Sequence, residues 1–234
     1  VVVTVFVNPL QFGEGEDLDR YPRTLDDDLV VAGSAGADLV LAPSVDEVYP
    51  GGRPQVTVHP GPLGDVLEGA VRPGHFSGVL TVVTKLFNIV RPNVAVFGEK
   101  DAQQLFLVRR LVRDLNLDID VVGAPIIRED DGLALSSRNR YLSTEERAAA
   151  LSLVRALTAA ASNGDRGIRE MISQAQGALM DEKLVKMDYV SIVDPETFAL
   201  VNEAYTGKAL VLVAARVGTT RLIDNMSAYV GEYR

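Results

Sequence analysis

Two segments of the sequence place cationic side chains where phosphate groups could bind. Gly98-Glu99-Lys100-Asp101 follows an apolar run and precedes an amphipathic stretch, which predicts a strand-to-helix junction. Backbone amides at a helix N-terminus attract phosphate, whereas a lysine in the first turn opposes the helix dipole unless an anion compensates it. Farther along, Ser136, Ser137 and Arg138 supply hydroxyls and a guanidinium that can hold several phosphate oxygens. The alternatives are that Asp101 only caps the helix and that Arg138 lies in a solvated loop.

Two amide side chains follow the first apolar run of the chain, Val1–Val7. They are Asn8 and Gln11. An amide offers both a donor and an acceptor, so the pair suits a ligand with hydroxyl and carboxylate groups, such as a hydroxy acid. The alternative is that Asn8 and Pro9 only form a turn.

Acidic and histidine side chains give weaker indications of chemistry. Asp27 and Asp28 could bind Mg²⁺, which prefers oxygen ligands together with substrate phosphates, but acids also suit the first turn of a helix. His75 stands beside a glycine and near an arginine, yet a lone histidine is more often a structural residue. No Ser-His-Asp arrangement, GxGxxG motif or Walker motif is evident in the sequence.

Apolar runs alternate with helix-like patterns in the first half of the chain. Such alternation predicts an open parallel α/β sheet, whose ligands bind beyond the carboxyl ends of the strands. Because the first run begins at Val1 with no preceding loop, we expect the sheet to lack at least one upstream βα unit. The expected strands are Val1–Val7, Asp38–Ala42, Val94–Phe97 and Asp118–Val122, and the expected helices are Gly78–Val90 and Asp101–Leu115.

The second half has a different pattern, which predicts a separate α+β domain. Ser143 and Glu146 have capping-box spacing and open an alanine-rich helix that ends near Ala161. The turn around Gly218 predicts an antiparallel hairpin. We therefore divide the chain into a sheet domain, residues 1–126, and a smaller α+β domain, residues 127–234. A further helix is expected over Gly167–Met180, and strands over Met187–Val193, Ala209–Ala215 and Thr220–Asp224.

Composition excludes several classes of protein. The net charge of −9 argues against broad nucleic-acid binding, which needs a basic face. Without cysteine there is no disulfide framework or zinc–thiolate site, and a reducing cytoplasm is the simplest setting. No apolar run approaches the roughly 20 residues that span a membrane. We therefore expect a protein that acts on small molecules, without nucleic-acid or membrane partners.

Several segments together resemble the pantothenate synthetase family, also called pantoate–β-alanine ligases. The resemblance runs from Val1 to nearly the last residue, with the segments in the family's order. The matching segments are residues 5–12 (VFVNPLQF), 21–24 (YPRT), 72–79 (RPGHFSGV), 97–104 (FGEKDAQQ), 135–142 (LSSRNRYL) and 214–225 (AARVGTTRLIDN).

The resemblance implies a Rossmann-like nucleotidyltransferase domain, a smaller C-terminal lid domain and a homodimer. It also implies a two-step reaction. The carboxylate of pantoate attacks the α-phosphorus of MgATP to give pantoyl adenylate and pyrophosphate, and the amine of β-alanine then displaces AMP. Neither step requires an enzyme nucleophile, so alignment and charge stabilisation carry the catalysis.

The resemblance also implies roles for individual residues. Gln11 and Gln104 correspond to the pair that holds pantoate, and Asn8 and His75 to residues that line the same pocket. The residues implied to bind the phosphates are Lys100, Ser136, Ser137 and Arg138, of which the last three resemble the KMSKS element of class I aminoacyl-tRNA synthetases. Those implied to contact the nucleotide are Gly98, Asp101 and Ile127. Those implied to bind a metal ion are Asp27 and Asp28.

One family segment has no counterpart between Val1 and Arg234. It is the PTMGxLHxGH segment, related to the HIGH motif, whose histidines contact ATP phosphates. We therefore expect the 234-residue chain alone to show little pantoate-dependent ATP–pyrophosphate exchange. Two other interpretations stay open at this point: a different nucleotidyltransferase of the same superfamily, and a non-catalytic module.

Overall fold

The computed structural model describes residues 1–232, which form two compact units. Unit 1 comprises residues 1–96 and 104–122, and unit 2 comprises residues 97–103 and the chain from Gly123 onward. The short segment 97–103 thus belongs to unit 2, although its neighbours along the chain belong to unit 1. The functional division at residues 126–127 stays a prediction.

The first strand of unit 1, β1 (Val2–Thr4), pairs in parallel with β2 (Leu39–Leu41). The strand predicted over Val1–Val7 is therefore too long, because β2 is short and Pro43, which has no N–H, follows it. Val2, in β1, is 41% exposed in the described part of the chain.

A second pair of strands runs through both units. β3 (Val94–Gly98) pairs with β4 (Asp120–Ala124). Asp120 N donates to Asn93 O and Glu99 N donates to Ala124 O, each at 2.8 Å. These bonds join corresponding ends of the two strands, so the pair is parallel. The parallel α/β class predicted from the alternating pattern is confirmed.

The helix α4 (His75–Val90) supplies much of the core of unit 1 through buried side chains such as Phe76 and Val79. It begins earlier than predicted because Gly74, at φ 81°, turns the chain into the helix before the periodic pattern starts. It ends before Pro92, as predicted. The other helical elements of the first half are η1 (Pro9–Gln11), α1 (Leu25–Ser34), α2 (Val45–Val48), η2 (Pro62–Gly64), α3 (Glu68–Val71) and α5 (Ala102–Asp114).

Unit 2 contains an antiparallel sheet of β5 (Val185–Val193), β6 (Gly207–Val217) and β7 (Thr220–Val230) in that order. The predicted hairpin between the last two strands is confirmed, but both strands are longer than expected. Only one face of an antiparallel sheet needs apolar residues, so polar positions such as Asn225 continue the strand and hide its length in the sequence.

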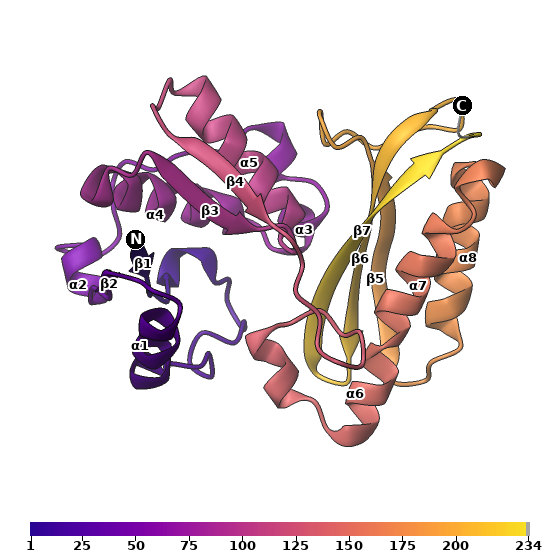
Figure 1. Cartoon of the computed structure of the whole chain (residues 1–234), viewed down its shortest axis with the longest axis horizontal. Helices are drawn as coiled ribbons and strands as arrows, with labels where there is room; N and C mark the ends of the chain where they lie inside the picture. Colours follow the sequence, from indigo (N-terminus) through magenta and orange to yellow (C-terminus); the bar gives the residue numbers. More distant parts are fainter. Residues whose placement is uncertain (233–234) are drawn as a thin grey trace. The chain divides into compact units, whose positions relative to one another are not determined.

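Helices cover one face of this sheet, as Figure 1 shows for α7 (Ser152–Ala161) and α8 (Ile168–Met180). Their buried side chains, among them Leu157 and Met171, form one core with the apolar side chains of β5, β6 and β7. The predicted alanine-rich helix is divided at Leu151 into α6 (Thr144–Ala150) and α7.

Two shorter helical segments complete unit 2, namely η3 (Ser137–Tyr141) and η4 (Gly164–Arg166). The predicted capping box of α6 is confirmed, because Ser143 Oγ accepts from Glu146 N at 3.2 Å and Glu146 Oε2 accepts from Ser143 N at 2.8 Å. Over residues 1–232, no helix combines the length and the apolar character that crossing a bilayer would require.

Candidate active site

The amide of Gln11 is held by Asn8 at the start of η1. Asn8 is 3% exposed, and its Nδ2 donates to Gln11 Oε1 and to Gly78 O, each at 3.1 Å. Its Oδ1 accepts from Tyr49 Oη at 2.8 Å. Burial raises the pKa of Tyr49 to about 12, so the phenol stays protonated and can donate. These bonds make Asn8 a positioning residue for Gln11, and its direct contact with a substrate stays a prediction.

The helix α4 approaches η1 closely at Gly78. A Cβ at this position would lie 2.3 Å from Leu10 O and 2.7 Å from Gln11 N, distances that real Cβ atoms do not show. Only glycine therefore permits this approach, because both neighbours are backbone atoms that cannot move aside as a flexible side chain would. The backbone of Gln11 is fixed by this packing.

His75, in the first turn of α4, bonds the same turn of chain. Its Nδ1 lies 2.8 Å from Gln11 O, and its Nε2 lies 3.1 Å from an Arg72 nitrogen. A carbonyl only accepts and a guanidinium only donates, so the ring is neutral with its proton on Nδ1. Burial, followed by the charge of Arg72, lowers the pKa of His75 from 6.5 to about 4. His75 therefore positions Gln11, and its predicted contact with a substrate stays a prediction.

Arg72 connects this network to a carboxylate from the preceding loop. Its guanidinium pairs with both Glu16 oxygens, at 2.9 and 2.6 Å, and donates to Gln11 O at 3.3 Å. Burial raises the pKa of Glu16, but the hydrogen bond and charge of Arg72 outweigh it, so the pKa lies below the ordinary 4.5. Arg72 is thus neutralised and aims its remaining donors at Gln11 and His75.

The neutral His75 should make stability depend on pH. Its pKa is lower in the folded chain than in the unfolded one, so its contribution is complete above about pH 6.5 and is lost as the pH falls toward about 4. We expect unfolding by urea to show that the free energy of unfolding falls by about 2–3 kcal/mol over this interval. Glu16 adds to this loss of stability only when the pH falls below 4.5, the ordinary pKa of a glutamate.

The matched control is His75→Asn, whose amide can still donate to Gln11 O but does not titrate. In this variant the part of the pH dependence that lies above about pH 4.5 should disappear. Identical pH profiles for the two proteins would show that His75 is not the titrating group.

Gln104 lies in the first turn of α5, which follows the carboxyl end of β3. Its side chain is half-buried. The position agrees with that of Gln11, because each glutamine comes shortly after a parallel strand. Their action on one substrate stays a prediction.

In unit 2 the Lys100 loop, residues 98–101, begins where β3 ends. Lys100 Nζ lies 3.9 Å from Asp101 Oδ2, and the Lys100 side chain is 20% exposed. A separation of 3.9 Å is too long for a hydrogen bond, so Asp101 forms only a weak ion pair with this ammonium. A Cβ at Gly98 would meet open space, so crowding within the described chain does not explain the glycine. Both features agree with a ligand that approaches the loop.

The Ser136–Arg138 segment lies in the same unit. Ser136 caps η3, and its Oγ accepts from Arg138 N at 3.3 Å. Asn139 Nδ2 donates to Glu129 Oε1 at 2.6 Å and to Ala134 O at 3.1 Å, which ties the segment to the chain that precedes it. Ile127, predicted to contact the nucleotide, is 64% exposed, as an apolar surface for a base would be.

Asp27 and Asp28 lie in the first turn of α1. Consecutive helix residues point about 100° apart, so the two carboxylates do not converge on one ion. Within residues 1–232, no group of three or more His, Cys, Asp or Glu side chains could hold a metal. A metal at this position would therefore need substrate oxygens as its main ligands, and the predicted role stays a prediction.

Comparison with known proteins decides the family. A family model described as pantoate-beta-alanine ligase matches residues 1–227. The chain belongs to the pantoate–β-alanine ligase family. This assignment confirms the resemblance drawn from the separate sequence segments.

Curated members of the pantoate–β-alanine ligase family are similar over nearly the whole chain. The pantothenate synthetase of a Nocardioides species is 61% identical over 232 residues, which cover 99% of this chain and 70% of that protein. The pantothenate synthetase of Saccharopolyspora erythraea is 56% identical over 232 residues, with 99% and 76% covered.

Solved structures of the family have the same fold. Pantothenate synthetase from Thermus thermophilus matches with a TM-score of 0.91 and 50% identity, covering 96% of this chain and 82% of that one. Pantoate-beta-alanine ligase from Francisella tularensis, complexed with beta-gamma ATP and beta-alanine, matches with a TM-score of 0.77 and 32% identity, covering 96% and 78%.

Sequence reasoning missed several residues of this candidate site. Tyr49 and Glu16 were not singled out, and Arg72 was noted only as a neighbour of His75. The spacing of Arg72 and His75 was the one available signal, because residues three apart can meet on a helical turn. Tyr49 and Glu16 gave no signal, since each acts on a residue more than 40 positions away.

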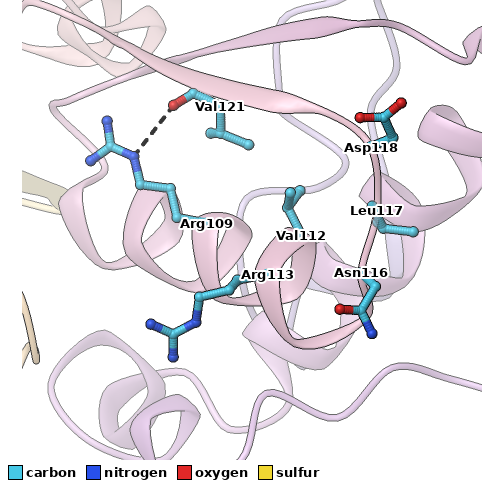
Figure 2. A pocket seen from close by; sticks show the side chains of 7 residues that line it. All are labelled: Arg109, Val112, Arg113, Asn116, Leu117, Asp118 and Val121. Atoms are coloured by element: carbon cyan, nitrogen blue, oxygen red, sulfur yellow. Dashed lines mark hydrogen bonds between the residues drawn. The ribbon is translucent and has the colours of Figure 1, made fainter.

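A surface pocket of about 540 Å³ in unit 1 is a different feature (Figure 2). Its lining comes from the last turns of α5 and the chain into β4, where Arg109 Nε donates to Val121 O at 3.5 Å. The lining residues are Arg109, Val112, Arg113, Asn116, Leu117, Asp118 and Val121. This is the amino end of β4, whereas ligands of α/β sheets bind at carboxyl ends. The ligase residues predicted from sequence do not line it.

Proposed function

We propose that this chain catalyses the ATP-dependent condensation of pantoate with β-alanine, as the names of its family and relatives indicate. The observation that supports this most strongly is the family match over residues 1–227. That range contains the amide side chains of Asn8 and Gln11 and the cationic side chains of Lys100 and Arg138. The Francisella enzyme was solved in complex with beta-gamma ATP and beta-alanine, which agrees with these substrates.

In the first step a pantoate carboxylate oxygen bonds to the α-phosphorus of ATP, and the bond from that phosphorus to pyrophosphate breaks. Gln11 and Gln104 hold pantoate by hydrogen bonds, while Lys100 and Arg138 stabilise the negative charge on the phosphates. Gln11 suits this role because Asn8 orients its amide before any substrate arrives. Pre-orientation lowers the entropy that binding would otherwise cost.

In the second step the β-alanine nitrogen bonds to the acyl carbon, the bond from that carbon to AMP breaks, and the nitrogen loses a proton. No side chain needs to form a covalent bond in either step. Because the pKa of His75 lies at about 4 and both ring nitrogens are occupied, His75 does not take up this proton near neutral pH.

Mg²⁺ would reach the site together with ATP. Phosphate oxygens and one or two carboxylates are the usual environment of this ion. The exposed Asp27 and the half-buried Asp28 could at most add a ligand to such a complex. The ion would reduce the negative charge that Lys100 and Arg138 must offset.

The proposed function is tested with the enzyme expressed from its complete coding region. We expect ATP–pyrophosphate exchange that requires pantoate, and pantothenate, AMP and pyrophosphate as products when β-alanine is added. Formation of ADP, or exchange that proceeds equally well without pantoate, would rule out the adenylate route.

Replacing Gln104 by alanine should specifically weaken the binding of pantoate. Loss of its hydrogen bonds at about 1–3 kcal/mol corresponds to a rise of about 5- to 150-fold in the KM for pantoate, with the KM for ATP unchanged. The control is Gln174→Ala, which removes an exposed glutamine from α8. An unchanged pantoate KM in the Gln104 variant would refute its role in binding.

We also propose that the enzyme is a homodimer, as the family resemblance implies, and that it acts in the cytoplasm. The absence of cysteine is compatible with a reducing compartment. Light scattering on the purified enzyme should give about twice the mass of one chain. A monomeric mass at micromolar concentration would contradict the dimer.

A further inference from the structure

Two adjacent residues of β7, Asp224 and Asn225, each bond a different segment that the ligase reaction uses. Asn225 bonds the Lys100 loop, and Asp224 bonds Arg128, next to the predicted nucleotide contact Ile127. We propose that Asn225 is a positioning residue that orients the Lys100 loop for ATP. This inference rests on the proposed function and adds a residue to its machinery.

The contacts of Asn225 use the whole donor capacity of its amide. Its Nδ2 donates to Glu99 O and to Lys100 O, each at 2.9 Å. Asn225 is 5% exposed, so water does not replace these bonds easily. On the other side of the loop, Glu99 N donates to Ala124 O at 2.8 Å. Residues 99 and 100 are thus held from β4 and from β7 together.

The hydrogen bonds from Asn225 determine where the backbone N–H groups of the Lys100 loop point. In a trans peptide the C=O and the following N–H lie on opposite sides of the bond, and the described chain has no cis peptide. Since Asn225 draws the carbonyls of Glu99 and Lys100 toward β7, the N–H groups of Lys100 and Asp101 point away from β7. Successive N–H groups on one side of the chain form a concave site for anions.

The same hydrogen bonds determine the position of the Lys100 ammonium. A lysine side chain is a flexible point charge, so its position over a phosphate depends on the backbone that carries it. Asn225 therefore acts on ATP through two routes, the Lys100 ammonium and the adjacent N–H groups. It touches neither substrate itself.

Asp224 gives the neighbouring segment the same support. It accepts two bonds from the Arg128 guanidinium, at 2.7 and 3.1 Å, and Arg128 also donates to Gly132 O at 3.1 Å. These bonds fix the start of the chain that leads to the Ser136–Arg138 segment. β7 is thus a common support for both phosphate-binding segments within unit 2.

The test compares Asn225→Ala with Asn163→Ala. Asn163 is a matched control in the same unit, where its Nδ2 donates to the backbone carbonyl of Ala159 at 2.9 Å. We expect Asn225→Ala to lower the rate of pantoate-dependent ATP–pyrophosphate exchange about 10- to 100-fold, the range of a lost supporting contact. The KM for pantoate should change little, and the control should keep its full rate.

Hydrogen exchange gives a readout that does not depend on activity. Amides of residues 98–103 should exchange several-fold faster in Asn225→Ala than in the wild type, whereas those of α7 and α8 should not. If that variant fails to fold, Asn225→Ser, which keeps one donor, should show a smaller change of the same kind. Unchanged exchange in these residues of a folded variant would overturn the proposal.

A double variant with Lys100→Ala tests the route of action. If Asn225 works partly through Lys100, the double variant should lose less activity than the product of the two single losses. Fully multiplicative losses would overturn that route. Absence of exchange activity in the wild-type enzyme expressed from its complete coding region would refute the proposed function instead. The hydrogen-exchange comparison would still decide whether Asn225 holds the Lys100 loop.

Discussion

Replacing Lys100 by alanine is expected to slow adenylation by about 10²- to 10³-fold, the usual cost of removing a group that stabilises transition-state charge. The free energy of unfolding should fall by no more than about 1 kcal/mol, the typical effect of a single substitution. Both expectations follow from the same geometry, because the ammonium is 3.9 Å from Asp101 and therefore contributes little to folding. Pre-steady-state formation of pyrophosphate and a urea denaturation curve measure the two effects.

The control for Lys100 is Lys186→Ala, which removes the same charge from an exposed position of β5. That variant should keep its adenylation rate, which separates a local effect from a change of net charge. If Lys100→Ala instead lost stability and rate in equal measure, its role would be structural.

Replacing Arg128 by methionine is expected to destabilise the fold by about 3 kcal/mol, the lower end of the range for breaking a buried ion pair. The Asp224 side chain is 3% exposed and accepts from Arg128 at 2.7 Å, so the substitution leaves a buried carboxylate without its cation. Guanidinium denaturation of the two proteins measures the difference in unfolding free energy.

A second substitution tests this reason. In Arg128→Met/Asp224→Leu the unpaired charge is gone, and at least half of the lost stability should return. The control is Arg113→Met, whose partner Asp114 lies in an exposed pair with 68% and 61% of the two side chains accessible. It should change stability by less than about 1 kcal/mol. Equal losses at Arg113 and Arg128 would show that burial is not the cause.

Most helices and strands could be predicted because their signals are local. The spacing of apolar residues located α5 to within a residue at each end, and the pair Ser143 and Glu146 located the start of α6. The predicted ends of strands were wrong where the length of a neighbouring strand determines where the pairing stops. β1 stops early because its partner β2 is short, and β7 runs on because β6 does.

The candidate site was predicted less evenly. Lys100 and Gln11 could be singled out because the chemistry of a charge or an amide can be read from the residue type alone. Ile127 was named only through the family resemblance. Asn8 and His75 were expected to line the pocket. The structure shows that their polar atoms bond Gln11, and their contact with a substrate stays a prediction. Which polar atoms of a side chain are already occupied depends on the packing around it.

The sequence by itself determined the family, the order of the elements and the groups that can meet a phosphate or a hydroxy acid. These properties depend on residue type and on spacing over a few positions. Only the tertiary structure decided which residues support them, such as Tyr49 for Asn8 and Asn225 for the Lys100 loop. Those partners lie 41 and 126 positions apart in the chain, and folding alone brings such distant groups within hydrogen-bond reach.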